Sequence, residues 1–252
     1  LGIMSFAVLI FIMLGKKIGL KERLLIQQSL NQTSLGGIIK LIKSLFIYSF
    51  AIEMLAMLIL AVKWIPEYGL ARGIYYSLFH AVSSFNNAGF SIWPDSLMRY
   101  EGDPLVNLVI SFLFIVGGIG FTVLSDLWHK RSFKKLSLHS KLMIYGTFIV
   151  NLAAMILIFL LEYQNQKTLG MLPLAEKLWG AYFQAVTPRT AGFNTTDIGS
   201  LRESTITLLL LLMFVGAGSA STGGGIKLTT FLVILLSVIT FLKGKKHISI
   251  AK

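Results

Sequence analysis

Two short polar segments of the chain have residue types that can coordinate a cation through the main chain. They read NAGF at 87–90 and TAGF at 190–193, so in each a small polar residue and alanine precede a glycine and a phenylalanine. Glycine adopts dihedral angles that let successive carbonyls point toward one axis. Carbonyls arranged in this way replace the hydration shell of an ion. The expected ion-binding groups are the main-chain oxygens of Asn87, Ala88, Gly89, Thr190, Ala191 and Gly192.

A third segment, GAGSASTGGGIK at 216–227, combines five glycines with three small hydroxyl residues. This composition cannot maintain a stable helix. It also fails as a nucleotide-binding motif, because Ile226 separates Gly225 from the lysine that would follow it. Close helix packing through small residues is an alternative, but the segment is longer than such packing needs. We expect a flexible gating loop that obstructs a pore and moves to open it. Its residues are Gly216, Gly218, Ser219, Ser221, Gly223, Gly224, Gly225 and Lys227.

The sequence around these polar segments is apolar. Of the 252 residues, 55% are hydrophobic and 13% are charged, whereas a soluble domain carries about a quarter charged residues. Several apolar runs approach the roughly 20 residues needed to cross a bilayer, which predicts an all-α polytopic membrane protein. The expected spans are 1–14 (the end of one helix), 41–62, 105–125, 142–161 and an interrupted region 204–242. The absence of cysteine excludes disulfides and thiolate metal sites.

The basic residues predict the orientation of these spans. Fifteen of the 23 lysines and arginines lie in 15–43, 126–141 and the tail from 243 onward, and loops rich in Lys and Arg face the cytoplasm. Topology therefore explains the net charge of +12 without a nucleic-acid partner. Two helical segments, 73–86 and 176–187, are too short to span and lie between points on the outer side. They must enter the membrane and return to the same side.

The two re-entrant regions are copies of each other. The first reads IYYSLFHAVSSFNNAGFS at 74–91 and the second LWGAYFQAVTPRTAGFNT at 178–195, with one single-residue gap between them. An apolar helix precedes and follows each copy, so the unit is helix, pore loop, helix. We expect repeated units around an ion pore. Residues 41–140 and 141–252 would be two such units, and 1–40 the end of a preceding unit with a cytoplasmic linker.

The sequence also gives predictions for several side chains in or near these loops. Phe90 and Phe193 should pack behind the filter and hold its diameter. Arg189 should point away from the pore axis, bonded to carbonyls or to an acid, because an inward guanidinium repels cations. Glu53 lies within a span, where a carboxylate is costly, so either a structural pair or a role in permeation is open. For His80 we expect a buried hydrogen bond and no metal.

The motifs SSFNNAGFS, TPRTAGFNT and GAGSASTGGGIKLTTF together resemble the Trk/Ktr/HKT superfamily of K⁺ transporters, and they fit the Ktr-type membrane subunit best. The resemblance implies four helix–pore loop–helix repeats around one pore. This chain, which starts within an apolar run, is then a fragment with the end of repeat one and all of repeats two and three. The first pore loop and the fourth repeat, with its pore-facing arginine, are missing.

The resemblance also implies the biological setting. Such subunits form homodimers in the cell membrane and take up K⁺, often in a Na⁺-dependent way. Cytoplasmic nucleotide-binding regulatory subunits gate them, and the basic segments 15–43 and 126–141 are candidate docking surfaces. Anionic lipid is an alternative contact for the same charges. No organic cofactor is expected in this chain.

Two other functional classes remain open from the sequence. A secondary transporter with broken helices would bind a small anionic solute at half-helix N-termini, but its repeats are normally inverted, whereas these run in parallel. A membrane scaffold without transport would leave the polar re-entrant loops unexplained. The residues form no nucleophile–base pattern and no metal-ligand spacing, so we expect no enzyme activity.

Overall fold

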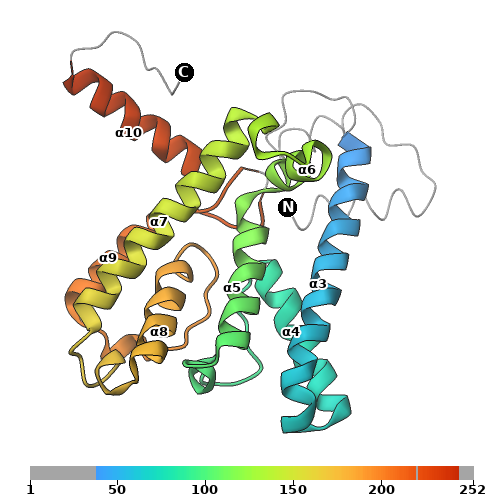
Figure 1. Ribbon diagram of the computed structural model, residues 1–252, viewed down its shortest axis with the longest axis vertical. Helices are drawn as coiled ribbons and strands as arrows, with labels where there is room; N and C mark the ends of the chain where they lie inside the picture. The colour runs from blue at the N-terminus through green and yellow to red at the C-terminus, as the bar shows by residue number, and fades with distance from the viewer. Residues whose placement is uncertain (1–37, 220, 244–252) are drawn as a thin grey trace.

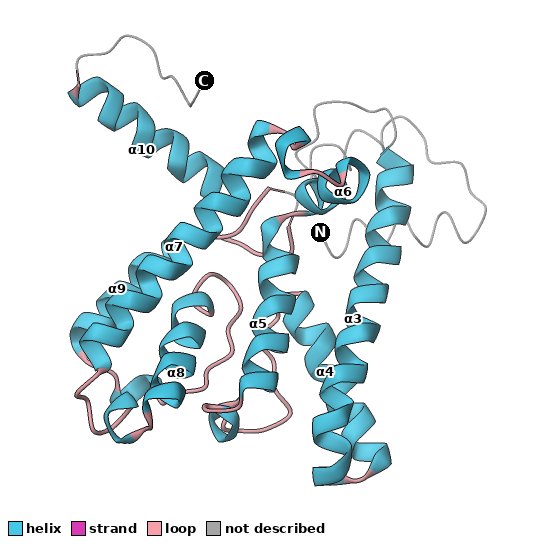
Figure 2. Cartoon of the chain, in the orientation of Figure 1, coloured by secondary structure: helices cyan, strands magenta, loops and turns pink. Residues whose placement is uncertain are grey.

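The computed structural model describes residues 38–219 and 221–243. The predicted helix end at 1–14, most of the linker to residue 40 and the last basic residues lie outside the described residues. Figures 1 and 2 show an all-helical arrangement in the described part, without a strand. The α-helices are α3 (Ile38–Tyr68), α4 (Leu70–Phe85), α5 (Pro104–Ile119), α6 (Phe121–Lys130), α7 (Leu138–Glu162), α8 (Leu174–Val186), α9 (Glu203–Phe214) and α10 (Leu228–Leu242). Short 3-10 turns occur at Met98–Tyr100, Phe133–Lys135, Leu169–Met171 and Ile198–Ser200.

Two described helices are long and apolar enough to cross a membrane by themselves. They are the 23-residue part of α3 from Phe46 to Tyr68 and the 25 residues of α7. The predicted third span, 105–125, is interrupted at Gly120, so only its part up to Ile119 belongs to one helix. The chain bends by 95° between α5 and α6, because Gly120 has a φ of +105° that a continuing helix cannot adopt. The predicted interruption of 204–242 appears as the gap between α9 and α10.

The two short helices α4 and α8 reverse the chain direction. Gly69, with a φ of +80°, ends α3, and α4 then returns alongside it. In Figure 1 the chain after α4 and the chain after α8 both run back toward the lower end, where each short helix began. Asp103 accepts the N–H of Val106 and caps α5, so the next long helix starts at that same end. This is the re-entrant course that the loop charges predict.

The main core joins the two halves of the chain. Trp64 and Phe85 come from the first half, Phe183 and Phe193 from the second, and all four are almost fully buried. His80 is also buried and stacks on Trp93 with 4.5 Å between ring centroids. Its Nδ1 bonds the main-chain oxygen of Tyr76 at 2.8 Å and its Nε2 the hydroxyl of Ser91 at 3.1 Å. The expected buried hydrogen bond of this histidine is confirmed.

Candidate functional site: two polar segments and a glycine loop

The two polar segments share an unusual main-chain conformation. Asn87 and Gly89 have positive φ angles of 51° and 71°, and Thr190 and Gly192 have 73° and 83°. The first and third residues of NAG and TAG therefore lie in the left-handed region, which glycine adopts freely. A β-branched threonine is rarely found there. Such strain persists only where the surroundings enforce it, and it concentrates at functional sites.

The segments also meet, although they are a full repeat apart in sequence. A Cβ atom added to Gly89 would lie 2.7 Å from the carbonyl oxygen of Ala191 and 2.9 Å from the Cα of Gly192. A Cβ on Gly192 would lie 3.2 Å from the Cα of Gly89. The two main chains thus approach closely at these glycines, and a side chain at either would separate them.

The same hydrogen bond supports each segment from its own short helix. Ser83, near the end of α4, donates its hydroxyl to the carbonyl of Phe90 at 2.7 Å. Thr187, just after α8, donates its hydroxyl to the carbonyl of Phe193. Sequence reasoning did not single out these hydroxyl residues, although they occupy matching positions in the two copies. A residue-by-residue alignment of the two copies would have shown that both have a hydroxyl side chain at this position.

The two phenylalanines differ in their surroundings. Phe193 is buried, with 1% of its surface exposed, and packs in the main core as expected. Phe90 is 70% exposed, so the prediction that it packs behind the filter is wrong for the described residues. The copies have similar sequences, but helices of both halves enclose the second segment, whereas nothing described covers Phe90.

The glycine loop between α9 and α10 folds back on itself. Gly216 N–H donates to the carbonyl of Ile226 at 3.0 Å, and Ala217 N–H donates to that of Gly224 at 3.1 Å. Lys227 donates from Nζ to the carbonyl of Gly223 at 3.0 Å. Ser221 donates its hydroxyl to the carbonyl of Gly218 at 2.7 Å. The loop residues of the predicted gate thus bond mainly to one another.

The end of α5 holds this loop in place. Gly218 N–H donates to the carbonyl of Gly118 at 2.8 Å, and Thr222 N–H donates to that of Gly117 at 3.2 Å. A Cβ on Gly117 would clash first with the carbonyl oxygen of Phe85 and would also lie 2.9 Å from the hydroxyl of Thr222. Gly117 therefore gives room both to the end of α4 and to the loop.

The loop also contacts both polar segments. Asn87 donates from Nδ2 to the hydroxyl of Thr222 at 2.7 Å, and this hydroxyl donates to the carbonyl of Phe85 at 3.2 Å. Gly223 lies against the hydroxyl of Thr190. Thr222 was absent from the predicted gating residues, because only the tertiary structure shows its contact with Asn87.

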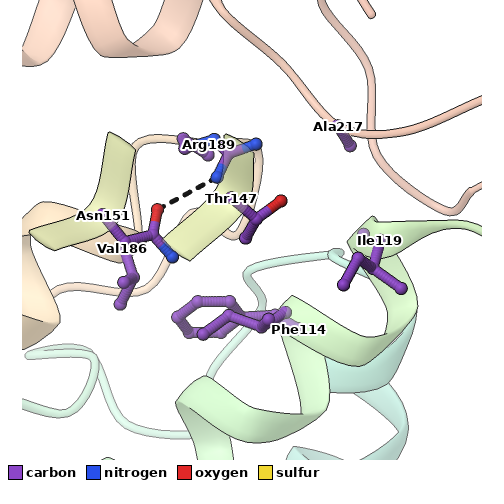
Figure 3. Close-up of a pocket in the computed structure, with 9 residues that line it drawn as sticks. Phe114, Ile119, Thr147, Asn151, Val186, Arg189 and Ala217 are labelled. Atoms are coloured by element: carbon purple, nitrogen blue, oxygen red, sulfur yellow. Dashed lines mark hydrogen bonds between the residues drawn. The ribbon is translucent and has the colours of Figure 1, made fainter. Parts of the chain in front are cut away.

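Arg189 links the second polar segment to the loop and to α7 (Figure 3). The side chain is buried, and it donates from Nη1 to Oδ1 of Asn151 at 3.0 Å and from Nη2 to the carbonyl of Gly216 at 3.2 Å. Bonding to a carbonyl agrees with the expectation for this arginine. A small cavity of about 20 Å³ lies beside it, lined also by Phe114 and Thr147.

Two acids, the buried Glu162 and the half-buried Glu101, hold the outer loops that lead into these segments. Glu162 accepts hydrogen bonds from Asn165, Thr168, Thr205 and the N–H of Arg202, and so ties the end of α7 to the start of α9. Glu101 accepts the hydroxyl of Thr196. Burial raises the pKa of Glu101; the bond from Thr196 opposes this shift and the charge of Glu176 adds to it.

The donor set of this site suits a monovalent cation bound by oxygen. Within residues 38–219 and 221–243, no group of three His, Cys, Asp or Glu side chains could hold a metal ion. Two buried oxygens, Oδ1 of Asn87 and Oγ1 of Thr190, accept no hydrogen bond in the same part of the chain. They occupy the same position in the two polar segments. Main-chain carbonyls and these side-chain oxygens are thus the groups available to an alkali ion.

Comparison with known proteins gives the chain a family. The Ktr system potassium uptake protein B of Bacillus subtilis (strain 168) is 63% identical over 98% of this chain and 56% of its own length. The protein of the same name from Vibrio alginolyticus is 37% identical over 100% and 56%. The potassium/sodium uptake protein NtpJ of Enterococcus hirae is 37% identical over 97% and 54%. The chain therefore spans just over half the length of these relatives.

A similar solved structure and a matching family model are consistent with these relatives. The crystal structure of the potassium transporter TrkH from Vibrio parahaemolyticus superposes with a TM-score of 0.70 at 20% identity, over 91% of this chain and 48% of that one. This likeness shows the fold, which is an all-helical arrangement with interrupted helices. The family model described as "TrkH: Cation transport protein" matches residues 1–252. The chain thus belongs to the TrkH family of cation transport proteins and is a multi-pass membrane protein.

Proposed function

We propose that the full-length protein is the pore-forming membrane subunit of a potassium uptake system, and that this chain supplies two of its filter segments. The observation that carries the proposal is the meeting of Gly89 and Gly192, each in a segment with the same alternating positive φ angles. Irregular main chain at membrane depth survives only where it faces protein or water. Two such segments that share a conformation and converge favour a common ion path.

The ion-binding groups in this proposal are the main-chain oxygens of Asn87, Ala88, Gly89, Thr190, Ala191 and Gly192. The acceptor atoms of Asn87 and Thr190 that lack a donor support it, since an oxygen that faces a cation has no need of a hydrogen bond. K⁺ is the transported ion, and Na⁺ is the candidate coupling ion. The names of the relatives from Bacillus subtilis and Enterococcus hirae, which specify potassium and potassium/sodium uptake, support both assignments.

The test is rescue of a strain deficient in K⁺ uptake by the full-length protein. We expect growth at low K⁺ concentration that increases with added Na⁺, and faster Rb⁺ uptake as a direct tracer. A secondary transporter of an organic solute would leave growth at low K⁺ unchanged. That result, with the protein present in the membrane, would reject the potassium proposal.

The glycine loop is the gate in this proposal. It contacts both filter segments through Thr222 and Gly223, and the bond from Lys227 to Gly223 closes it. Its glycines supply a hinge. Deletion of 218–224 should raise Rb⁺ flux, because the obstruction is removed. Unchanged or lower flux in a variant that folds and reaches the membrane would contradict a gating role.

The assembly partners follow from the same family relationship. We infer a homodimer of the full-length subunit and a cytoplasmic nucleotide-binding regulatory subunit. The basic residues at the end of α6 and in the connection to α7 offer a docking surface, since Lys130, Arg131, Lys134 and Lys135 are all exposed. Co-purification of a regulatory subunit with the wild-type protein, and its loss after these four residues are changed to glutamine, would test the surface.

A further inference from the structure

Glu53 lies beside the inner end of the first filter segment. The helices α3 and α4 run antiparallel from Gly69, and Glu53 lies about as far before this glycine as Asn86 lies after it. Its Oε1 accepts a hydrogen bond from Nδ2 of Asn86 at 3.0 Å. Asn86 ends α4 and immediately precedes Asn87, the first filter residue. The carboxylate is thus one side chain away from the filter main chain.

This position is unfavourable for a carboxylate on structural grounds. The C-terminal end of a helix carries partial negative charge, so an acid next to the end of α4 is repelled. Glu53 also lies within the apolar stretch Phe46–Tyr68, where a charge is costly. None of the ion pairs of the described residues includes it. The amide of Asn86 is its polar contact, and a neutral amide does not offset the cost of a charge at membrane depth.

In the second copy, a hydrogen bond also joins the long helix to the filter segment, but its charged partner is positive. There Asn151 of α7 accepts a hydrogen bond from Arg189 of the filter segment at 3.0 Å. In each copy, a polar side chain from the first long helix therefore bonds a residue at the inner end of the filter. The charged partner is Glu53 on the helix in one copy and Arg189 on the filter segment in the other. The two copies place one negative and one positive charge around the same site.

We propose that Glu53 is the residue that sets the electrostatic potential at the inner end of the filter, where its charge offsets that of Arg189 and favours a dehydrated monovalent cation. This inference rests on the proposed function, because it assumes that the segments at 87–89 and 190–192 bind the transported ion. Glu53 acts at a distance through its charge, and its bond to Asn86 fixes where that charge lies.

The test separates the charge from the hydrogen bond. Glu53→Gln keeps the oxygen that accepts from Asn86 and removes the charge, whereas Asn86→Ala removes the bond and keeps the charge. We measure Rb⁺ uptake into proteoliposomes with the full-length protein. Glu53→Gln should raise the KM for Rb⁺ roughly tenfold, the effect of removing one unit charge at an assumed distance of about 10 Å and an effective dielectric constant of about 20. Asn86→Ala should change KM by less.

Further variants keep the outcomes distinct. Glu203→Gln removes an exposed charge at the outer end of α9 and should leave KM unchanged. A KM of Glu53→Gln equal to that of the wild type would overturn the inference, as would an equal or larger change in Asn86→Ala. If the wild-type protein takes up no Rb⁺ at all, the proposed function fails instead. If the wild-type protein takes up Rb⁺ and Glu53→Gln leaves the KM unchanged, only the role of Glu53 is rejected.

Discussion

Substitution of Gly89 by alanine tests whether the close approach of the two polar segments matters for conduction. The matched control is Gly69→Ala. Both glycines have positive φ angles, +71° for Gly89 and +80° for Gly69. A Cβ at Gly89 would lie 2.7 Å from the carbonyl oxygen of Ala191, whereas a Cβ at Gly69 has no atom within 4 Å. The two variants therefore have similar main-chain strain, and only Gly89→Ala adds a steric clash.

The expected magnitudes follow from these two terms. An alanine in the left-handed region costs about 1–2 kcal/mol, and this conformational cost is common to both variants. At Gly89 the main chains must also separate by about 0.7 Å to restore ordinary van der Waals contact. Gly69 lies at the turn between α3 and α4, away from both polar segments, so its variant leaves them undisturbed.

The assay is Rb⁺ and Na⁺ uptake by the full-length protein in proteoliposomes, with thermal denaturation of the same samples. Gly69→Ala should conduct as the wild type does. Gly89→Ala should lose at least tenfold in Rb⁺ flux or lose its discrimination against Na⁺, because the carbonyls no longer converge. If Gly89→Ala folds and conducts with wild-type selectivity, the two segments do not form the ion path.

Two further predictions concern the outer loops. Glu162→Gln should destabilise the protein by roughly 2–4 kcal/mol, because a buried carboxylate that accepts four hydrogen bonds is lost; a melting temperature equal to that of the wild type would contradict this. For Glu101, the folded-state pKa is raised, so the unfolded chain ionises first and stability falls as pH rises above the ordinary value of 4.5. Glu101→Gln should therefore raise the melting temperature at pH 7.5 and have no such advantage below pH 4.5, whereas a pH-independent difference would mean that packing is responsible.

The sequence predicts the elements of this fold because apolar length and glycine content are local properties. The interruption at 216–227, for example, follows from five glycines in one short segment. The bend at Gly120 was not predicted, since one glycine near the end of an apolar run is compatible with a continuing helix. Its φ of +105° depends on how α6 and the loop before α7 pack, which the local sequence does not contain.

The candidate site was likewise predicted only in part from the sequence. The two polar segments were found from their own residues, but their supporting contacts come from elsewhere in the chain. Thr222 reaches Asn87 across 135 residues, and Arg189 reaches Gly216 across 27. Hydroxyl and glycine residues are common in loops, so their types alone do not identify such partners. The prediction for Phe90 failed because it assumed that similar sequences have similar surroundings.

The unequal enclosure of the two copies bears on how the proposed pore is completed. Phe193 is buried between helices of both halves, and Phe90 and Ala88 are exposed beside the same site. An irregular main chain that faces open space is stable at membrane depth only where protein or water covers its polar groups. The relatives are nearly twice as long as the aligned region. Segments from the remainder of a full-length protein would therefore close the filter on the side of Phe90, and cross-linking from position 90 in that protein should identify them.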